Sequence, residues 1–524
     1  MSITADAGRA ELLLDGLTER AAARAPEHVA LIQDEERLSY AALHSSVLRC
    51  VAALRASGIG PGDRVGYLGL NSIDYVIVMQ ALLRIGGVLV MINWRLVERE
   101  VAYIVGDADI ALLVTDAERL SVANGLVTMT VLVDAGHDGR PPFRQWIAEF
   151  DEDAAMRAPA ADDVAVQLYT SGTTGNPKGA LLTHGSLSAS LRQGKLSEQK
   201  WAEWNDHDVA LVAMPQFHVG GTAWTLQTIS AGGTAVLLAK PDIDQILASV
   251  ELHGITKMFA VPAVLGMMLD HPMAKTADLT SLRTLLYGAS PISPDILRGS
   301  MRLFPNAQFV QMYGSTETSG TIVYLPPEDH DVAGTPRMEG CGRPYPEVEL
   351  RIIDTEGELL GPGKVGEVQV RSPLVMKGYH KLPEETARTL ADGWYRTGDA
   401  GFLDADGYLY LYDRVKDMIV SGAENIYPAE IERVLHEHPD VRDCAVIGVP
   451  DPRWGEAVKA VIVARAGSSP TADALIAYAR THMAGYKVPK SIDFVDELPR
   501  NASGKVLKRI LREQYWGEGQ RQVG

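Results

Sequence analysis

The sequence predicts an α/β protein with a large N-terminal domain of several packed parts and a small α+β C-terminal domain. The 524 residues are too many for a single hydrophobic core. Between Leu12 and about Leu113, helical stretches alternate with short apolar runs such as "RVGYLGL" and "GGVLVMIN". This alternation is typical of βα units around a largely parallel sheet.

Two later changes of pattern predict the remaining parts of the N-terminal domain. The runs "DVALVAMP", "GGTAVLLA" and "ITKMFAVP" have the length of strands and are bounded by Pro or Gly. They predict a second α/β layer. After Arg343 the chain changes to short strands and tight turns, including a hairpin signal at Asp406-Gly407. This part is expected to form a β-rich subdomain.

The polar step "DRVKD", from Asp413 to Asp417, marks the boundary between the two domains. We therefore expect an N-terminal domain over 1–412, a connecting segment over 413–417 and a C-terminal domain over 418–524. In the C-terminal domain, the spacing of Ile431 and Leu435 predicts a helix with one buried face.

Composition and charge narrow the possible classes of protein. The chain is 46% hydrophobic and 22% charged, which is ordinary for an α/β enzyme. The net charge of −18 argues against general binding to nucleic acid or to an anionic membrane. Three cysteines without a pairing or metal-ligand spacing indicate a reducing cytoplasm. The start of the chain lacks the apolar core of a signal peptide.

The most apolar segment, "YVIVMQALLRIGGVLVMINW", is not expected to span a membrane. Arg84 and the pair Gly86-Gly87 interrupt it, and a span needs a longer uncharged run. The segment instead predicts a buried helix followed by a strand.

The segment "LYTSGTTGNPKGALLTH", from Leu168 to His184, combines glycines, threonines and a lysine between apolar runs. It is not a Walker A loop, because Pro177 precedes Lys178 and the residues that follow are strand-like. Its backbone N–H groups, hydroxyls and lysine are nevertheless suited to binding phosphate. A phosphate-binding loop and a mobile surface hairpin both remain open for this segment alone.

Two further segments carry residues suited to a nucleotide. In "QMYGSTETSG", Tyr313 has a ring that can stack on a base and Glu317 has a carboxylate that can ligate Mg²⁺. In "GWYRTGDAG", Asp399 can accept both hydroxyls of a ribose. Taken alone, the first segment also fits a polar turn and the second an Asx-turn.

These three segments are followed by "DRVKDMIVSGAENIYPAEIE" and "LPRNASGKVLKRIL". In this order the five motifs closely resemble the adenylate-forming superfamily of acyl-CoA synthetases, peptide-synthetase adenylation domains and firefly luciferase. The resemblance spans nearly the whole chain. It implies that ATP activates a carboxylic acid to an acyl-adenylate with release of pyrophosphate, and that the acyl group then passes to the thiol of CoA. The implied cofactors are ATP, Mg²⁺ and CoA.

The resemblance also implies roles for individual residues. Lys178, Thr316 and Glu317 would act on the phosphates, with Glu317 as the Mg²⁺ ligand. The remaining nucleotide-binding positions would be Thr170, Ser171, Gly172, Thr173, Thr174, Gly175 and Gly179 for the phosphates, Gly288, Ala289 and Ser290 for adenine and the acyl group, Tyr313 against adenine with Gly314 beside it, and Asp399 and Arg414 for ribose.

In the C-terminal part, Lys505 resembles the mobile lysine that bridges the attacking carboxylate and the α-phosphate when the small domain closes. Without the resemblance it would be one solvated lysine of a basic tail. Lys416 resembles the hinge residue. Ser421, Gly422 and Ala423 resemble the thiol tunnel, where the family commonly has glycine in place of Ala423. A methyl group there would narrow the tunnel or exclude a backbone with positive φ.

The segment "MPQFHVGGTAW" resembles the acid-binding segment of fatty and aryl acyl-CoA synthetases. His218 would lie near the carboxylate, Gly220 and Gly221 would leave room for the acyl chain, and Trp224 would close a short pocket. This predicts a small, medium-chain or aryl acid. Locally, His218 fits a packed core histidine equally well.

Two other functions remain to be separated from an acyl-CoA synthetase. A stand-alone adenylating enzyme would deliver the activated group to the phosphopantetheine of an acyl carrier protein or to another nucleophile. A catalytically silent nucleotide-binding protein is disfavoured by the intact set Lys178, Glu317, Asp399, Arg414 and Lys505. As partners we expect a carboxylic acid and CoA or a carrier protein, without nucleic acid, in a monomer or a homodimer.

Overall fold

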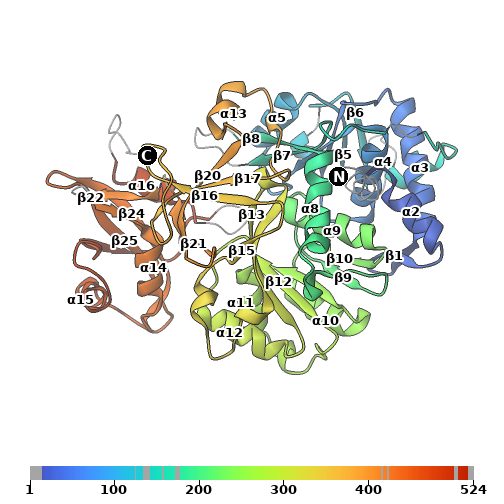
Figure 1. Ribbon diagram of the computed structural model, residues 1–524. Coiled ribbons are helices and arrows are strands. Elements are labelled where there is room, and N and C mark those ends of the chain that lie inside the picture. Colours follow the sequence, from blue (N-terminus) through green and yellow to red (C-terminus); the bar gives the residue numbers. More distant parts are fainter. Residues whose placement is uncertain are drawn as a thin grey trace, which may run out of the picture. The chain divides into compact units, whose positions relative to one another are not determined.

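The computed structural model describes residues 14–123, 125–133, 142–155, 158–170, 177–414, 417–421, 424–500 and 506–516 (Figure 1). The chain divides into two compact units. The first contains Met1–Glu349 and Arg371–Tyr395, and the second contains Leu350–Val370 and Arg396–Gly524. Each unit is described by itself below.

A nine-stranded sheet forms one layer of the first unit. Its central strands, from β13 to β1, are parallel, and the strands at both edges are antiparallel. The strand order is β15 (Arg343–Pro344), β14 (Gly320–Leu325), β13 (Gln308–Ser315), β12 (Thr284–Gly288), β11 (Lys257–Ala260), β9 (Val209–Val212), β10 (Thr234–Leu237), β1 (Val29–Gln33) and β2 (Glu36–Ser39).

A seven-stranded sheet forms the second layer of this unit. Its strands from β7 to β6 are parallel, and β8 and β18 extend it with antiparallel pairing. The order is β18 (Gly378–Tyr379), β8 (Lys178–Thr183), β7 (Val164–Thr170), β4 (Val88–Ile92), β3 (Arg64–Leu68), β5 (Ile110–Thr115) and β6 (Met129–Leu132).

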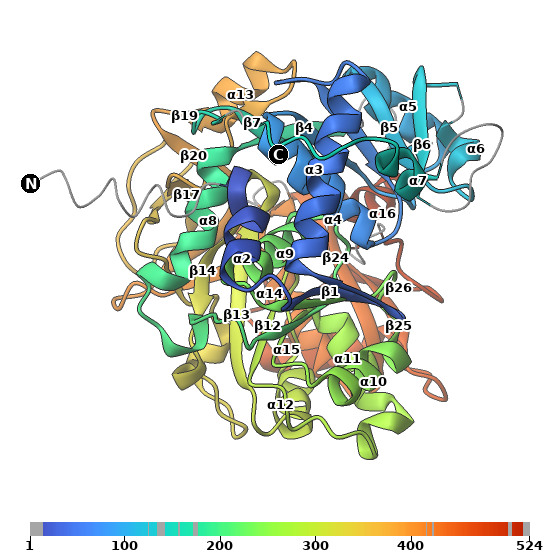
Figure 2. The same ribbon diagram turned by 90° about the vertical axis from the view of Figure 1, so that its right-hand side faces the viewer.

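Helices lie between these sheets and on their outer faces (Figure 2). Helix α4 contacts strands of both sheets, and α8 and α9 contact each other while packing on β8 and on β9 and β10 respectively. Apolar residues of α10, α11 and α12 cover the other face of the nine-stranded sheet. The helices of this unit are α2 (Leu17–Arg24), α3 (Tyr40–Ala56), α4 (Ile73–Ile85), α5 (Glu98–Asp107), α6 (Leu120–Ala123), α7 (Phe143–Ala148), α8 (His184–Leu196), α9 (Val219–Ala231), α10 (Ile243–His253), α11 (Pro262–Asp270), α12 (Pro294–Leu303) and α13 (Pro383–Thr389).

The most apolar segment of the sequence forms a buried helix and a buried strand, as predicted. The Ser72 side chain accepts a hydrogen bond from the Tyr75 backbone N–H and so caps the start of α4. Gly86 ends the helix with a φ of 73°, a left-handed conformation that glycine adopts without strain. Every residue of α4 is buried. Within the described part of the chain, no helix has both the length and the apolarity needed to cross a membrane.

The second unit contains a β-rich sheet and an α+β part. In the β-rich sheet, β16 (Glu349–Ile353), β17 (Gly366–Arg371) and β20 (Trp394–Leu403) are neighbours, and β21 (Leu409–Arg414) pairs with β20. The antiparallel pairing of β20 and β21 confirms the predicted hairpin, in which Gly407 has a φ of 80°.

The α+β part is built on the order β23 (Glu424–Ile426), β22 (Ile419–Ser421), β25 (Gly455–Ala464) and β24 (Val441–Asp451), with β26 (Ser491–Phe494) paired to β25. Helices α14 (Pro428–His436) and α15 (Ala472–His482) share one apolar cluster with the sheet, and α16 (Lys508–Glu513) joins a second cluster on the other side. Ile431 and Leu435 of α14 are fully buried, as their spacing predicted.

The predicted fold class is confirmed by two α/β layers, a β-rich sheet and a small α+β part. The division into domains at 413–417 stays a prediction, as does the mobility of the C-terminal domain. No disulfide joins Cys50, Cys341 and Cys444, and all three are buried.

Candidate functional site

The glycine-rich segment connects two antiparallel strands of the seven-stranded sheet. Strand β7 ends at Thr170, β8 begins at Lys178, and these two residues lie opposite each other in the register. The segment is therefore the connection of a β-hairpin. The predicted phosphate-binding residues of the connection itself lie outside the described residues, namely Ser171, Gly172, Thr173, Thr174 and Gly175.

Lys178 is buried, with 9% of its surface exposed, and its ammonium group forms an ion pair with Glu385 of α13. Glu385 also pairs with Arg388. The hydrogen bond from Lys178 is the main reason that the pKa of Glu385 lies below its usual range. Nζ of Lys178 lies 5.3 Å from the centre of the Tyr379 ring, within the range of a cation–π contact.

Glu317 lies in a short 3-10 turn, η4 (Thr316–Thr318), directly after β13. Its Oε1 accepts hydrogen bonds from the Tyr379 hydroxyl at 3.0 Å and from the Thr170 hydroxyl at 3.3 Å. The backbone carbonyl of Glu317 also accepts a hydrogen bond from the N–H of Met376 at 2.8 Å. Tyr379 therefore links the carboxylate of Glu317 to the ammonium of Lys178, and the structure brings Thr170, Lys178 and Glu317 together.

Tyr379 and Glu385 belong to this site, although neither was predicted from the sequence. Strand β18, which carries Tyr379, has only two residues and pairs with β8, where Tyr379 lies opposite Ala180. The N–H of His380 donates to the carbonyl of Gly179 at 2.7 Å and extends this pairing. The only signal in the sequence is the acidic start of α13 in "KLPEETA", which does not indicate a contact with a residue some 200 positions earlier.

The ends of β12 and β13 lie side by side and hold the residues predicted to contact adenine and the acyl group. A Cβ atom on Gly288 would lie 2.1 Å from the carbonyl oxygen of Met312, and one on Gly314 would lie 2.0 Å from that of Gly320. Both glycines are therefore required by the close approach of the backbones. Ala289 follows with a φ of 68°, which is uncommon for a residue with a side chain.

This edge is also where ligands bind in parallel α/β sheets. It is the carboxyl edge of the strands, and Ser290 is exposed there while Tyr313 and Thr316 are half-buried.

His218 lies at the start of α9, on the same edge of the sheet, and its ring contacts Phe217 with 4.5 Å between ring centres. Its Nε2 has no hydrogen-bond partner among the described residues. Burial, reinforced by the charge of Arg95, lowers the pKa of His218 to about 4. The imidazole is therefore neutral at physiological pH.

Gly220 and Gly221 differ in what they face. A Cβ atom on Gly220 would lie 3.0 Å from Cε of Met214 and 3.5 Å from the ring of Phe259. A Cβ atom on Gly221 would lie 2.3 Å from the carbonyl oxygen of Pro215. Gly220 therefore faces side chains of the predicted acid site, whereas Gly221 allows two backbone segments to pack closely.

Trp224 lies one helical turn after Gly220 in α9 and is buried. Its indole N–H donates to the carbonyl of Leu211 at 3.0 Å, and its ring contacts Trp204 and Phe259, with 4.9 and 6.2 Å between ring centres. The side chain thus belongs to an aromatic group on the face of the sheet that carries α9.

In the second unit, the two residues predicted to bind ribose are direct neighbours. Asp399 of β20 lies opposite Arg414 of β21 in the antiparallel register. The N–H of Asp399 donates to the hydroxyl of Thr397 at 3.0 Å. Ser421 is the last residue of β22. Four predicted residues of the second unit lie outside the described part of the chain, namely Lys416, Gly422, Ala423 and Lys505.

Comparison with known proteins identifies the family of the chain. The family model of AMP-binding enzymes matches residues 18–380, and the model of their C-terminal domain matches residues 430–505. The chain is 42% identical to a fatty acid–[acyl-carrier-protein] ligase, ScoC, of Streptomyces coeruleorubidus, covering 95% of both chains. It is 41% identical to a feruloyl-CoA synthase of an Amycolatopsis species, covering 95% of this chain and 98% of the relative.

A solved structure shows the same fold at full length. The crystal structure of ATP-bound MatB from Rhodopseudomonas palustris matches with a TM-score of 0.86 and 31% identity, over 96% of this chain and 99% of that one. The family model alone covers more than half of the chain. The chain belongs to the family of AMP-binding enzymes.

Proposed function

We propose that the protein is an acyl-CoA synthetase, which uses ATP to convert a carboxylic acid to an acyl-adenylate and then transfers the acyl group to the thiol of CoA. The observation that carries this proposal is the convergence of Lys178 and Glu317 on Tyr379, next to the glycine-rich connection. The cation Lys178 stands at one end of the connection, and the Glu317 carboxylate is hydrogen-bonded to Thr170 at the other end. A cation and a carboxylate placed in this way suit a nucleoside triphosphate with its metal ion. The names of the relatives, a feruloyl-CoA synthase among them, support the same reaction class.

In the first step, the carboxylate of the acid attacks the α-phosphate and pyrophosphate leaves. An anion must approach a polyanion, so catalysis depends on cations and on positioning. Lys178 supplies a buried positive charge for the phosphates, and Thr316, next to Glu317, supplies a hydroxyl donor. Lys505 would bring a second cation to the attacking carboxylate.

The carboxylate of Glu317 fits a Mg²⁺ ligand, because both of its described hydrogen bonds go to Oε1. Mg²⁺ sites at nucleotides commonly use one or two carboxylates together with phosphate oxygens. When bound, the ion would neutralise charge on the phosphates. Tyr379 and Thr170 hold the Glu317 carboxylate in place for this contact.

The other predicted roles follow the positions of the residues. Gly288, Ala289, Ser290, Tyr313 and Gly314 are proposed to line the adenine and acyl sites at the carboxyl edge of the nine-stranded sheet. Asp399 and Arg414, neighbours on β20 and β21, are proposed to hold ribose. His218 is proposed to contact the acid with its neutral imidazole.

The acceptor in the second step is proposed to be CoA. Lys416 would act as the hinge, and Ser421, Gly422 and Ala423 would border the thiol tunnel. The second candidate acceptor is the phosphopantetheine of an acyl carrier protein, which is favoured by the similarity to the ligase of Streptomyces coeruleorubidus.

A screen of pyrophosphate release over diverse carboxylic acids tests this function. The reaction is run with ATP and Mg²⁺, with and without CoA, and product masses are read. We expect acid-dependent release in both conditions and an acyl-CoA mass only with CoA. Adenylate formation without thioester in the presence of CoA would favour the carrier protein or another nucleophile. Absence of release with every acid would contradict the proposal.

Gly220→Ala and Gly221→Ala form a matched pair that separates pocket shape from fold stability. Gly220→Ala is expected to raise KM for the acid by about 3- to 10-fold, because a methyl group narrows the site. Gly221→Ala is expected to lower the free energy of unfolding by about 1–3 kcal/mol, because its methyl group meets the Pro215 carbonyl. Thermal unfolding and acid-dependent initial rates measure both effects. Equal stability loss in the two variants would contradict this assignment.

Glu385→Gln tests how tightly Lys178 is held before ATP binds. Removal of the negative charge frees the ammonium for phosphate, so KM for ATP is expected to fall by about fivefold, the equivalent of about 1 kcal/mol for a partly exposed ion pair. Initial rates at varied ATP measure the change, with Glu384→Gln, an exposed neighbour on α13, as the control. An unchanged or higher KM for ATP would show that Glu385 does not restrain Lys178.

A further inference from the structure

Lys257 is a buried cation on the face of the nine-stranded sheet that carries the predicted acid site. It is the first residue of β11 and only 5% exposed. Side chains alternate between the two faces of a strand. Met258 and Ala260 belong to the apolar cluster beneath α10, α11 and α12, so Lys257 and Phe259 lie on the opposite face, toward α9.

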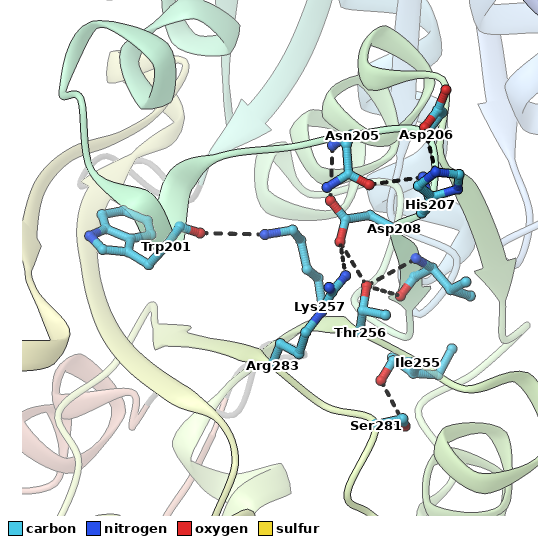
Figure 3. Close-up of polar contacts among 11 residues, drawn as sticks. Trp201, Asn205, Asp206, His207, Asp208, Ile255, Thr256, Lys257, Ser281 and Arg283 are labelled. Carbon is cyan, nitrogen blue, oxygen red and sulfur yellow. Dashed lines mark hydrogen bonds and ion pairs between the residues drawn. The ribbon is translucent and has the colours of Figure 1, made fainter.

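The ammonium of Lys257 is poorly satisfied by the described residues. It can donate three hydrogen bonds, but it makes one long bond of 3.4 Å, to the carbonyl of Trp201 (Figure 3). Its Nζ lies 5.0 Å from the centre of the Trp204 ring. No carboxylate of the described part of the chain forms an ion pair with it. Burial is the main reason that the pKa of Lys257 lies below its ordinary value.

The neighbouring charge network does not need Lys257. Oδ1 of Asp208 accepts hydrogen bonds from Arg283 at 2.8 Å and from the Thr256 hydroxyl at 2.9 Å. Its Oδ2 accepts from the N–H of Asn205 at 3.0 Å. Figure 3 shows Asp208 and Arg283 joined to each other, while the Lys257 side chain extends toward Trp201. Asp208 therefore pairs with Arg283, and within the described part of the chain Lys257 has no carboxylate as an ion-pair partner.

A continuous group of aromatic side chains leads from the predicted acid site to Lys257. The Phe259 ring lies next to Gly220, 3.5 Å from the position of an added Cβ atom. Phe259 contacts Trp224, Trp224 contacts Trp204, and the Trp204 ring lies beside Nζ of Lys257. Along β11, Lys257 lies about 10 Å from Ala260 at the carboxyl edge, at about 3.3 Å per residue.

We propose that Lys257 determines specificity by binding an oxygen acceptor at the far end of the acid substrate. This inference rests on the proposed function. The aromatic side chains suit an aryl or short apolar body, and the ammonium suits a second carboxylate or a phenolic or carbonyl oxygen about 10 Å from the carboxylate that is activated. Such an oxygen restores the hydrogen bonds that burial removes from Lys257, whereas an acid without it leaves them unmade.

The test compares two pairs of acids that differ only at the far end. These are 4-hydroxycinnamic acid with cinnamic acid, and octanedioic acid with octanoic acid. Pyrophosphate release with the wild-type enzyme is expected to give a kcat/KM at least about tenfold higher for the oxygenated member of one pair, since a site built to bond an oxygen rejects the analogue that lacks it. Lys257→Met is expected to reduce this ratio to one or below. The pair of acids that shows the effect tells whether Lys257 binds a phenol oxygen or a second carboxylate.

Two variants control the result. Arg283→Gln removes the neighbouring cation, which is paired with Asp208 and 57% exposed in its side chain, and is expected to leave the ratio unchanged. Lys257→Gln keeps an amide NH₂ with two N–H donors but no charge, so it is expected to retain part of the preference for a phenol and to lose that for a carboxylate.

Thermal unfolding without acid separates specificity from a structural role. Lys257→Met is expected to be at least as stable as wild type, because it buries an apolar group in place of an unpaired cation. A lower Tm in both Lys257 variants, or an acid ratio that is the same in wild type and variants, would overturn the inference. Lack of pyrophosphate release with every acid and every variant would instead contradict the proposed function itself.

Discussion

Lys505→Ala is expected to abolish formation of the acyl-adenylate, with a loss of about 10²- to 10³-fold or more in acid-dependent pyrophosphate release. The physical reason is that two anions meet in this step, and the proposed role of Lys505 is to bridge the carboxylate and the α-phosphate. The second step needs no such bridge, since a thiol attacks an activated carbonyl. Formation of thioester from supplied acyl-adenylate is therefore expected to stay largely intact.

The two half-reactions are measured separately on the same preparation of the variant. Pyrophosphate release reports the first, and conversion of synthetic acyl-adenylate and CoA to acyl-CoA reports the second. Lys508→Ala is the matched control, because Lys508 lies three positions away and its ammonium pairs with Glu432 at 2.9 Å. Equal loss of both half-reactions in Lys505→Ala would remove the proposed role of Lys505.

Glu317→Gln is expected to reduce pyrophosphate release by about 10²-fold or more, because it removes charge from the proposed metal ligand where the adenylyl group is transferred to the acid and pyrophosphate leaves. The amide keeps the size of the side chain, so the fold is expected to remain.

Tyr379→Phe removes one hydrogen bond to Glu317 while the bond from Thr170 remains. The expected loss in the rate of pyrophosphate release is about 3- to 10-fold, the equivalent of about 1 kcal/mol.

Titration of the rate with Mg²⁺ distinguishes a metal ligand from a structural carboxylate. If Glu317 ligates the ion, Glu317→Gln requires a higher Mg²⁺ concentration for half-maximal rate, and Tyr379→Phe shows a smaller shift in the same direction. A Mg²⁺ dependence equal to that of wild type, with an intact Tm, would mean that Glu317 acts on another part of the reaction.

Local pattern was sufficient to predict the elements of the fold. The run from Tyr75 to Trp94 became a buried helix and strand because Gly86 ends the helix in a conformation that glycine favours. The hairpin at Asp406-Gly407 followed from turn chemistry alone. The order of motifs then placed the chain in a family whose models match residues 18–380 and 430–505.

Contacts between distant segments were not predictable in this way. Tyr379 lies on a strand of two residues, too short to give a periodic signal, and it reaches Glu317 only because β18 pairs with β8. Lys257 is the first residue of an apolar run and appears ordinary in the sequence. Its importance depends on burial and on the side chains of Trp204 and Trp201, which come from another part of the chain. Such properties belong to the packed structure.

Gly220 and Gly221 illustrate the same limit. The sequence assigned them one role as neighbours, but successive residues of a helix point in different directions. Gly220 faces Met214 and Phe259, while Gly221 faces the Pro215 backbone. Only the backbone geometry separates a residue that shapes a site from one that lets two segments approach.

The exchange of labelled pyrophosphate into ATP tests the central claim most directly, because it requires reversible formation of an acyl-adenylate and no acceptor. The purified protein is incubated with ATP, Mg²⁺, labelled pyrophosphate and each acid of the screen, without CoA. We predict exchange that depends on the acid and is lost in Lys505→Ala and Glu317→Gln. Absence of exchange with every acid, or release of ADP and phosphate in place of AMP and pyrophosphate, would contradict activation of a carboxylate by adenylation.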